Sequence, residues 1–407
     1  VTFTEAAAAE MKERIRGAIE KKLEEEPDNE HLKQQATLIH NARITTIHSF
    51  CLSVIRDHFP MIGLDPAFRI GEEGELKLLR HDVLDELLEE EYTEGRSQFL
   101  DFVSAYGTGK NDKKIEELIL KVYEYSRSYP DAQEWLHECV KGYELENLDE
   151  LEESPYVDLL KMYVELYLED ARARLYQGIE ICREDSGPYM YEDALEDDLR
   201  MVERVLGAET YQGLSEYMGD ISWMKLPPNR DKTVSSDKAD QVKLIRDEVK
   251  ELMKELNQQY FYAEPEIILK DIKGCQPMVR ELTSLVEKFA ERFEEKKRTK
   301  NMIDFSDMEQ YAMKILTEKT EGGFCPTAAA EEYQEQFLEI MIDEYQDSNL
   351  IQETILTSVS RYSRGEYNIF MVGDVKQSIY RFRLSRPELF MEKYDTYSTE
   401  VLSLIHI

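Results

Sequence analysis

Two short apolar runs, each ending in acidic residues, constrain the fold of this chain more than any other part of its sequence. The first run, at residues 337–342, stops at Asp343 and Glu344, and the second, at residues 368–374, ends in Asp374. Large apolar residues followed by carboxylates are typical of buried strands that deliver acids to the edge of a sheet. The sequence therefore predicts two buried strands whose ends carry these acids.

The segment between the two runs has the spacing of a helix. Its apolar residues recur at helical intervals, and they are Ile351, Ile355, Leu356 and Val359. Strand, helix and strand over about 30 residues make a βαβ unit, in which a right-handed crossover leaves the strands parallel. The carboxyl ends of both strands then open on one crevice, which Asp343, Glu344 and Asp374 share.

Adjacent carboxylates at a strand end suit a nucleotide that is carried with Mg²⁺. One acid can face the metal ion, directly or through its water ligands, while the other orients an attacking water. A solvated strand end is the other interpretation of a bare Asp-Glu pair, because short motifs produce false positives. A third is a metal nuclease using Asp343, Glu344 and Asp347, which the sequence disfavours because Gln-Asp-Ser follows where a nearby catalytic lysine is needed.

The longer strings around these acids are more specific. They read Asp-Glu-Tyr-Gln-Asp-Ser at residues 343–348 and Gly-Asp-Val-Lys-Gln-Ser-Ile-Tyr-Arg-Phe-Arg at residues 373–383. Both resemble motifs II and III of superfamily 1 DNA helicases of the UvrD/RecB type. The Tyr-Arg-Phe-Arg ending is most similar to the AddA group of helicase-nuclease subunits, and the resemblance extends over about residues 1–397.

The resemblance implies an α/β fold, namely a RecA-like P-loop NTPase domain with a parallel sheet, interrupted by a large all-α insertion domain. Residues 1–70 would form the first part of motor domain 1A, residues 71–295 the helical insertion domain 1B, and residues 296–397 the second part of domain 1A. Residues 398–407 do not resemble the family and are unassigned. The family's phosphate loop is expected upstream of Val1, and a second motor domain and a nuclease domain are expected downstream.

The resemblance also assigns a nucleotide site with ATP and Mg²⁺ as cofactors. Asp343 is expected to hold the Mg²⁺ ion, and Glu344 to activate the attacking water. Gln377 is expected to sense the γ-phosphate, since its amide can both donate and accept a hydrogen bond. These three residues form the candidate cofactor-binding set, in which Glu344 and Gln377 are the catalytic residues.

Two N-terminal phrases resemble the DNA-contacting motifs of the family. Phe3 would lie beside a base and Thr4 near a phosphate, while Thr46 and His48 would meet the backbone of single-stranded DNA. The residues alone leave another interpretation open, in which Phe3 belongs to a strand core and His48 is structural. The family more often has Asn at the position of Glu5, so this chain has an acid near the proposed DNA path.

The second acidic strand is followed by interleaved aromatic and basic residues. Tyr380 and Phe382 would stack on bases, a contact worth ~1–3 kcal/mol per base. Arg383 belongs to the same basic surface and is also a candidate DNA-binding residue. In the alternative interpretation, Tyr380 and Phe382 are core residues where the strand exits.

Local signals predict several element ends. Thr4 is expected to cap a helix that starts at Glu5. Residues 43–47 are a candidate strand, and Ser49 is a candidate cap for the helix that follows it. Ser306 is expected to cap a further helix near the end of the helical region.

The charge of the chain limits where nucleic acid could bind. A net charge of −35 argues against a general nucleic-acid-binding protein, whose usual footprint is a basic patch. The acids are concentrated at residues 72–91, 144–153 and 192–198, whereas residues 41–56 and 375–386 are neutral or basic. A DNA path could therefore cross the basic segments.

The remaining composition bounds the cellular setting. The five cysteines are scattered and show no CxxC spacing, which favours a reduced cytoplasmic compartment. No apolar run approaches the ~20 residues that a membrane helix needs, and we expect no signal peptide. We expect no membrane partner.

The implied function is that of an ATP-dependent DNA helicase and translocase, which works as one subunit of a helicase-nuclease complex in double-strand break repair and recombination. Its expected partners are single-stranded and duplex-end DNA and an AddB-type nuclease subunit, with which it forms a heterodimer. The isolated chain is expected not to hydrolyse ATP, because it lacks the lysine of the phosphate loop. The alternative is a helical interaction scaffold with a vestigial nucleotide-binding fold.

Overall fold

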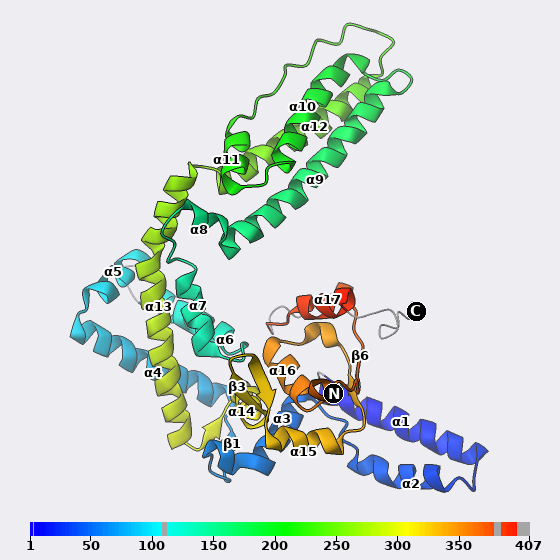
Figure 1. Cartoon of the computed structure of the whole chain (residues 1–407), viewed down its shortest axis with the longest axis vertical. Helices are drawn as coiled ribbons and strands as arrows, with labels where there is room; N and C mark the ends of the chain where they lie inside the picture. The colour runs from blue at the N-terminus through cyan, green and yellow to red at the C-terminus, as the bar shows by residue number, and fades with distance from the viewer. Residues whose placement is uncertain (3, 108–111, 378–383, 397–407) are drawn as a thin grey trace. The chain divides into compact units, whose positions relative to one another are not determined.

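The computed structural model describes residues 1–2, 4–107, 112–377 and 384–396 of the chain. Most of these residues are helical (Figure 1). The chain divides into two compact units, of which unit 1 comprises Val1–Leu136 and Glu281–Ile407 and unit 2 comprises His137–Arg280. Each unit has its own core and is described separately.

Unit 1 is assembled from both ends of the chain. Its N-terminal elements are α1 (Glu5–Glu25), α2 (Glu30–Leu38), η1 (Ile39–Asn41), α3 (Ile47–His58), η2 (Phe59–Ile62), β1 (Arg69–Ile70), α4 (Glu73–Glu94), α5 (Ser97–Tyr106) and α6 (Lys113–Ser126). Its C-terminal elements are β2 (Met302–Ile303), α14 (Phe305–Leu316), β3 (Thr317–Thr320), β4 (Gly323–Pro326), α15 (Ala328–Gln336), β5 (Ile340–Ile342), η4 (Tyr345–Asp347), α16 (Leu350–Ser358), η5 (Tyr362–Arg364), β6 (Ile369–Met371), η6 (Val375–Gln377) and α17 (Pro387–Thr396). Helices α7 (Ala132–Lys141) and α13 (Pro265–Thr299) contain the boundaries between the units.

The predicted βαβ unit is present in unit 1. Strand β5 pairs in parallel with β6, with Ile340 opposite Ile369, and α16 connects them along the chain. The predicted apolar face of the helix is buried, namely Ile351, Ile355, Leu356 and Val359. The prediction of two parallel strands joined by a helix is therefore confirmed. The prediction that both strands are buried is wrong, because Met341 of β5 and Phe370 of β6 are each 58 % exposed and β6 contains no buried residue.

The extended structure around β5 is small. The described residues form three sheets of two strands each, in which β1 pairs with β2 in parallel, β3 with β4 antiparallel, and β5 with β6 in parallel. The N-terminus adds a further extended segment beside β5, because the backbone N–H of Asp343 donates to Val1 O at 3.0 Å. On the other side of this segment, Thr2 forms an isolated parallel bridge with Thr46. The four segments therefore run side by side over very few residues.

The predicted strand at residues 43–47 is reduced to that single bridge, because α3 already begins at Ile47. Thr46 has an extended backbone and caps α3, since its Oγ1 accepts a hydrogen bond from Ser49 N at 3.2 Å. The prediction of Ser49 as the cap is wrong because Ser49 lies within the first turn of the helix. The prediction for Thr4 is confirmed, since its Oγ1 accepts from Ala7 N at 3.1 Å.

The cap of α14 differs from the predicted one in the same way. Asp304 precedes the helix, and its Oδ1 accepts a hydrogen bond from Asp307 N at 2.9 Å. Asp307 Oδ2 in return accepts from Asp304 N at 2.9 Å, which completes a reciprocal capping box. Ser306 lies inside the helix and is not its cap, so that prediction is wrong.

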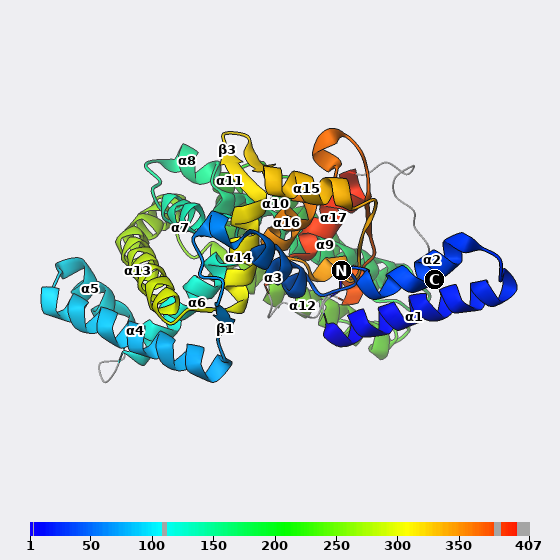
Figure 2. The same ribbon diagram turned by 90° about the horizontal axis from the view of Figure 1, so that it is seen from below.

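Helix α14 is the central helix of the unit 1 core. It packs against α3 and α16, and Figure 2 shows α3 and α14 side by side. The core around it also takes residues from α15 and β5. Fully or almost fully buried members include Val54, Ile55, Ile303, Ala312, Ile315, Leu316, Ile351 and Ile355.

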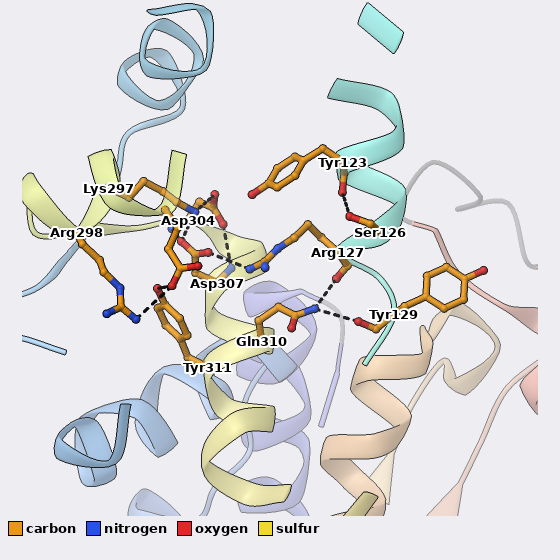
Figure 3. Close-up of polar contacts among 11 residues, drawn as sticks. Tyr123, Ser126, Arg127, Tyr129, Lys297, Arg298, Asp304, Asp307, Gln310 and Tyr311 are labelled. Carbon is orange, nitrogen blue, oxygen red and sulfur yellow. Dashed lines mark hydrogen bonds and ion pairs between the residues drawn. The ribbon is translucent and has the colours of Figure 1, made fainter. Parts of the chain in front are cut away.

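A buried ion cluster fixes the start of α14 to the end of α13 (Figure 3). Lys297 Nζ donates to Asp304 Oδ2 at 2.8 Å and to Asp307 Oδ2 at 2.5 Å. Arg127, directly after α6, donates through Nη2 to Asp307 Oδ1 at 3.0 Å. Burial alone would lower the pKa of Lys297, but the groups around it, including both carboxylates, raise the pKa above its ordinary value. The cluster therefore joins three helices through paired charges.

The backbone after α6 is held to the same helix. Gln310 of α14 donates through Nε2 to Arg127 O at 3.2 Å and to Tyr129 O at 3.1 Å (Figure 3). These bonds satisfy two backbone carbonyl groups in the segment that follows α6. The position of the segment after α6 is thus set by α14.

Unit 2 is an all-helical unit. Its elements include α8 (Leu148–Glu152), α9 (Pro155–Arg183), η3 (Tyr189–Tyr191), α10 (Glu192–Leu206), α11 (Tyr211–Gly219) and α12 (Ser236–Tyr260). Helix α9 packs along α10 and α12, as Figure 1 shows. A buried pair crosses this core, in which Arg246 Nε donates to Asp198 Oδ2 at 2.5 Å and Arg246 Nη2 donates to Met224 O at 2.6 Å. Across the described residues, no helix combines the length and the apolar character of a membrane span.

The first prediction concerns the buried cluster. We expect Lys297→Met to lower the free energy of unfolding by about 3–5 kcal/mol, because it leaves two buried carboxylates with Arg127 alone. The neighbouring Lys296→Met is the control, since Lys296 forms an exposed pair with Glu86, and its loss is expected to cost about 1 kcal/mol or less. Urea unfolding followed by circular dichroism measures both. Equal losses in the two variants would contradict this account of the cluster.

Candidate nucleotide and DNA site

Asp343 and Glu344 follow β5 directly, at the carboxyl end of the strand. Asp343 is half-buried and Glu344 is exposed. Glu344 has a left-handed backbone, with φ 54° and ψ 41°, a conformation that costs a non-glycine residue about 1 kcal/mol or more. The next residue is held in place, because Tyr345 N donates to Val372 O at 2.9 Å. The chain therefore turns sharply at Glu344 and leaves its side chain at the surface.

Gln346 connects the two acidic segments. Its Nε2 donates to Glu344 Oε2 at 2.7 Å, and its Oε1 accepts from Asp374 N at 3.0 Å. Asp374 in turn accepts at Oδ2 from Gln377 Nε2 at 2.9 Å. The structure thus brings Glu344, Asp374 and Gln377 into one hydrogen-bonded chain, through a glutamine that sequence reasoning did not nominate.

The electrostatics of Asp374 agree with this arrangement. The hydrogen bond from Gln377, followed by one from Lys376 N, lowers the pKa of the Asp374 carboxyl. The ionised form is therefore favoured, and it fixes the direction of the Gln377 amide.

Gly373 is required by the position of Gln346. A Cβ atom at residue 373 would lie 2.4 Å from Gln346 Oε1 and 3.1 Å from Gln346 N. The first distance is far below any normal contact, and Gln346 is 1 % exposed, so it has no room to move away. The glycine therefore allows β6 to pass close to the turn after Glu344.

The predicted DNA-binding residue Thr46 forms a hydrogen bond with the side chain of Glu5. Thr46 Oγ1 donates to Glu5 Oε1 at 3.0 Å, and Ser49 Oγ donates to the same oxygen at 2.6 Å. The bond from Ser49, followed by that from Thr46, lowers the pKa of Glu5. Thr46 Oγ1 also lies 3.0 Å from Ser49 Oγ, so both hydroxyls belong to one hydrogen-bonded network that ends at the Glu5 carboxylate.

The remaining predicted DNA-binding residues differ in what can be said of them. Thr4 is exposed and caps α1. Phe3, Tyr380, Phe382 and Arg383 lie outside the described residues.

His48 lines an open cleft of about 720 Å³ in unit 1. Its ring meets that of Phe305 edge-on, with centroids 5.5 Å apart, and its Nε2 lies 3.2 Å from Glu309 Oε1. The His48 side chain is 36 % exposed, so it is available to a ligand in the cleft.

The walls of the cleft combine positive charge with exposed rings. Arg80 of α4, Lys121 of α6 and Arg127 supply the positive charge, and the acids on the same walls are Glu124, Glu309 and Asp347. Phe305, at the start of α14, is 59 % exposed, and Tyr125 of α6 is 44 % exposed. Basic groups and aromatic faces together are what single-stranded nucleic acid uses for binding.

Sequence reasoning missed Phe305 and Tyr125 as site residues. Phe305 is the first residue of α14, directly after the cap Asp304, and its large apolar side chain is exposed there. That position was the available signal. Tyr125 offered no signal, because one tyrosine within an amphipathic helix is not distinguishable by spacing from its buried neighbours such as Tyr123.

Asp343 and Glu344 fit a magnesium nucleotide as a source of carboxylate ligands. Mg²⁺ usually keeps several waters and takes one or two protein carboxylates together with substrate phosphates. Asp343 and Glu344 supply such carboxylates at a strand end. In the described part of the chain, no group of three or more His, Cys, Asp or Glu side chains is arranged to hold a metal by itself.

The second prediction tests the close approach of Gly373 to Gln346. We expect Gly373→Ala to lower the free energy of unfolding by about 1–3 kcal/mol, because the added methyl group overpacks the turn. Gly17→Ala in α1 is the control, since a Cβ there meets no atom within 4 Å, and it is expected to be neutral or slightly stabilising. Urea midpoints of both variants provide the measurement. A neutral Gly373→Ala would contradict the arrangement.

Comparison with known proteins identifies the family. The model of the UvrD/REP helicase N-terminal domain matches residues 1–398. The chain is 47 % identical over 405 residues to the A subunit of the ATP-dependent helicase/nuclease of Lachnoclostridium phytofermentans, covering 98 % of this chain and 29 % of that protein. Proteins of the same name from Geobacillus thermodenitrificans and Bacillus cereus are 40 % and 39 % identical over 406 residues, covering 98 % and 99 % of this chain and 33 % of each relative. The chain spans about a third of the length of these relatives. It belongs to the UvrD/REP helicase family, whose N-terminal domain it matches over nearly its whole length.

Proposed function

We propose that this chain is part of the motor of an ATP-dependent DNA helicase and translocase. The observation that carries the proposal is the hydrogen-bonded chain from Glu344 through Gln346 and Asp374 to Gln377. It links the two strand ends at which the family's nucleotide motifs lie. The relatives are named as parts of an ATP-dependent helicase/nuclease, and this name supports the same function.

In this proposal the acids divide the work on ATP. Asp343 would hold Mg²⁺, which would neutralise charge on the phosphates when bound. Glu344 would orient and deprotonate the attacking water, because its side chain is exposed at the turn. Gln377, whose amide is aligned by Asp374, would respond to the γ-phosphate and alter the link back to Gln346.

Single-stranded DNA would occupy the cleft lined by His48 and Phe305. Phe305 and Tyr125 offer ring faces for stacking, and Arg80 and Lys121 offer positive charge. Thr4, Thr46 and His48 would contact the backbone on the side of α3. Phe3, Tyr380, Phe382 and Arg383 are proposed on the family resemblance alone.

The wider assignments follow from the family. We propose a RecA-like P-loop motor domain, formed by residues 1–70 and 296–397, with residues 71–295 as an all-α insertion. The described contacts group residues 71–136 with the same compact unit as both motor segments. Because the relatives are named as one subunit of a larger enzyme, we also propose a partner. This partner would be an AddB-type nuclease subunit, in a heterodimer that works on duplex ends in break repair.

A cytoplasmic location completes the proposal. All five cysteines are free: Cys51, Cys139, Cys182, Cys275 and Cys325. Free thiols are usual in reducing compartments.

The third prediction separates a motor from a scaffold. In the full-length protein we expect Glu344→Gln to lower DNA-stimulated ATP hydrolysis by about 10²–10⁴-fold, because general-base catalysis contributes that much, while ATP binding persists. Glu339→Gln, an exposed acid just before β5, makes the same charge change and is expected to keep activity. Steady-state hydrolysis with oligo(dT) and binding of a fluorescent ATP analogue are measured. A scaffold would show no effect of Glu344→Gln on its binding. DNA cutting by the isolated 407-residue chain with Mg²⁺ and no ATP would favour a nuclease that uses Asp343, Glu344 and Asp347.

The fourth prediction concerns the acid beside Thr46. We expect Glu5→Ala to raise affinity for single-stranded DNA about 2–5-fold at low salt, because it frees two hydroxyls and removes a charge that repels phosphate. Glu24→Ala, at the far end of α1, removes one acid without touching Thr46 and is the control. Fluorescence anisotropy of labelled oligo(dT) gives both affinities. If the two variants gain equally, the effect is one of total charge and not of this contact.

A further inference from the structure

Glu309 is a buried acid where α3, α14 and α16 meet, and the nucleotide and DNA motifs do not account for it. It is 6 % exposed and lies beside the apolar core residues of α14. Burial alone would raise the pKa of Glu309, but hydrogen bonds from His48, Gln352 and Asn349 lower the pKa below its ordinary value. A buried carboxylate lowers the stability of the fold unless it is paired and hydrogen-bonded. The three partners of Glu309 therefore need to be identified.

The three partners come from two different helices. His48 Nε2, from α3, lies 3.2 Å from Glu309 Oε1. From the start of α16, Gln352 Nε2 donates to Oε1 at 2.7 Å and Asn349 Nδ2 donates to Oε2 at 3.3 Å. A carboxylate only accepts hydrogen bonds, so His48 carries a proton on Nε2 and keeps Nδ1 for a ligand in the cleft.

The partners on α16 adjoin the nucleotide acids. Asn349 caps α16, since its Oδ1 accepts from Gln352 N at 2.9 Å. Between Glu344 and Asn349 there are only Ser348 and the single turn η4. Within that turn, Ser348 N donates to Tyr345 O at 3.1 Å. A shift at Glu344 therefore reaches Asn349 through one short, hydrogen-bonded segment.

We propose that Glu309 is a positioning residue that orients His48 toward single-stranded DNA and ties it to the start of α16, directly after Glu344. The inference rests on the proposed motor function and adds a residue to it. A DNA phosphate that accepts a hydrogen bond from Nδ1–H of His48 changes the bond between Nε2 of the same ring and Glu309. The same carboxylate holds Asn349 and Gln352, so the change is passed to the segment that follows the nucleotide acids.

The experiment uses Glu309→Gln in the full-length protein. Glutamine keeps the size and one acceptor oxygen but removes the charge. We expect the oligo(dT) concentration for half-maximal ATP hydrolysis to rise about tenfold, the value of one charge-assisted hydrogen bond, while the half-saturating ATP concentration changes less than about twofold. A purely structural role would move both, or would lower the maximal rate alone.

A double-variant comparison tests whether Glu309 acts through the imidazole. His48→Gln is expected to raise the half-saturating oligo(dT) concentration to a similar extent, and the double variant to raise it no further than either change alone. If the two shifts multiply, the residues act independently and the inference is overturned. An unchanged DNA half-saturation in Glu309→Gln also overturns it.

Two measurements keep the outcomes apart. If Glu309→Gln does not fold, as judged by its circular dichroism melt, Gln352→Leu removes one partner of the same carboxylate, and the same DNA shift is expected from it. Wild-type behaviour of Gln352→Leu would then overturn the inference. Stimulation of ATP hydrolysis by oligo(dT) is measured first in the unsubstituted protein. Its absence would refute the proposed function together with this inference. Stimulation that is present and that Glu309→Gln leaves unchanged would refute only the inference.

Discussion

The side-chain amide of Gln346 is the interaction on which the candidate nucleotide site depends. It donates to a carboxylate on one side and accepts from a backbone N–H on the other. If the amide were rotated by 180°, its oxygen would face the Glu344 carboxylate and its NH₂ group would face the backbone N–H of Asp374. The two partners therefore determine a single orientation of the amide. The parallel pairing of β5 with β6 brings those partners within reach, and Gly373 leaves the space that the amide fills. One side chain therefore converts two separate strand ends into one site.

The features that sequence predicted correctly are those set by local patterns. Apolar runs at residues 337–342 and 368–374 predicted the parallel strands, and helical spacing predicted the buried face of α16. The caps show where local patterns become ambiguous. Ser49 and Ser306 are reasonable caps by residue type, but each is preceded by a better acceptor with an extended backbone, namely Thr46 and Asp304.

The features that sequence could not predict depend on partners distant along the chain. Gln346 is one glutamine among several until β6 is placed beside it, and Glu309 is one acid among 85 acidic residues until His48 and α16 surround it. Phe305 has no signal other than its place beside a cap. In each case the role follows from tertiary contacts, which neither spacing nor residue type encodes.

Net charge is a poor guide to binding in this protein because it does not show where charges of each sign lie. Asp304 and Asp307 are neutralised by Lys297 and Arg127, and Asp198 by Arg246. The walls of the cleft beside His48 carry Arg80 and Lys121 together with Glu124 and Asp347, so their charges nearly balance in a chain whose total charge is −35. The distribution of charge over unit 1 matters more than its sum.

The left-handed backbone of Glu344 sets thermal stability against the proposed catalytic role of this residue. Glycine would relax at this position, since it adopts a positive φ without steric penalty, whereas the glutamate is held there by the turn that follows β5. Laboratory selection for heat resistance alone would therefore favour glycine and discard the proposed catalytic carboxylate. Engineering of this protein for higher thermal stability would therefore need to keep glutamate at residue 344.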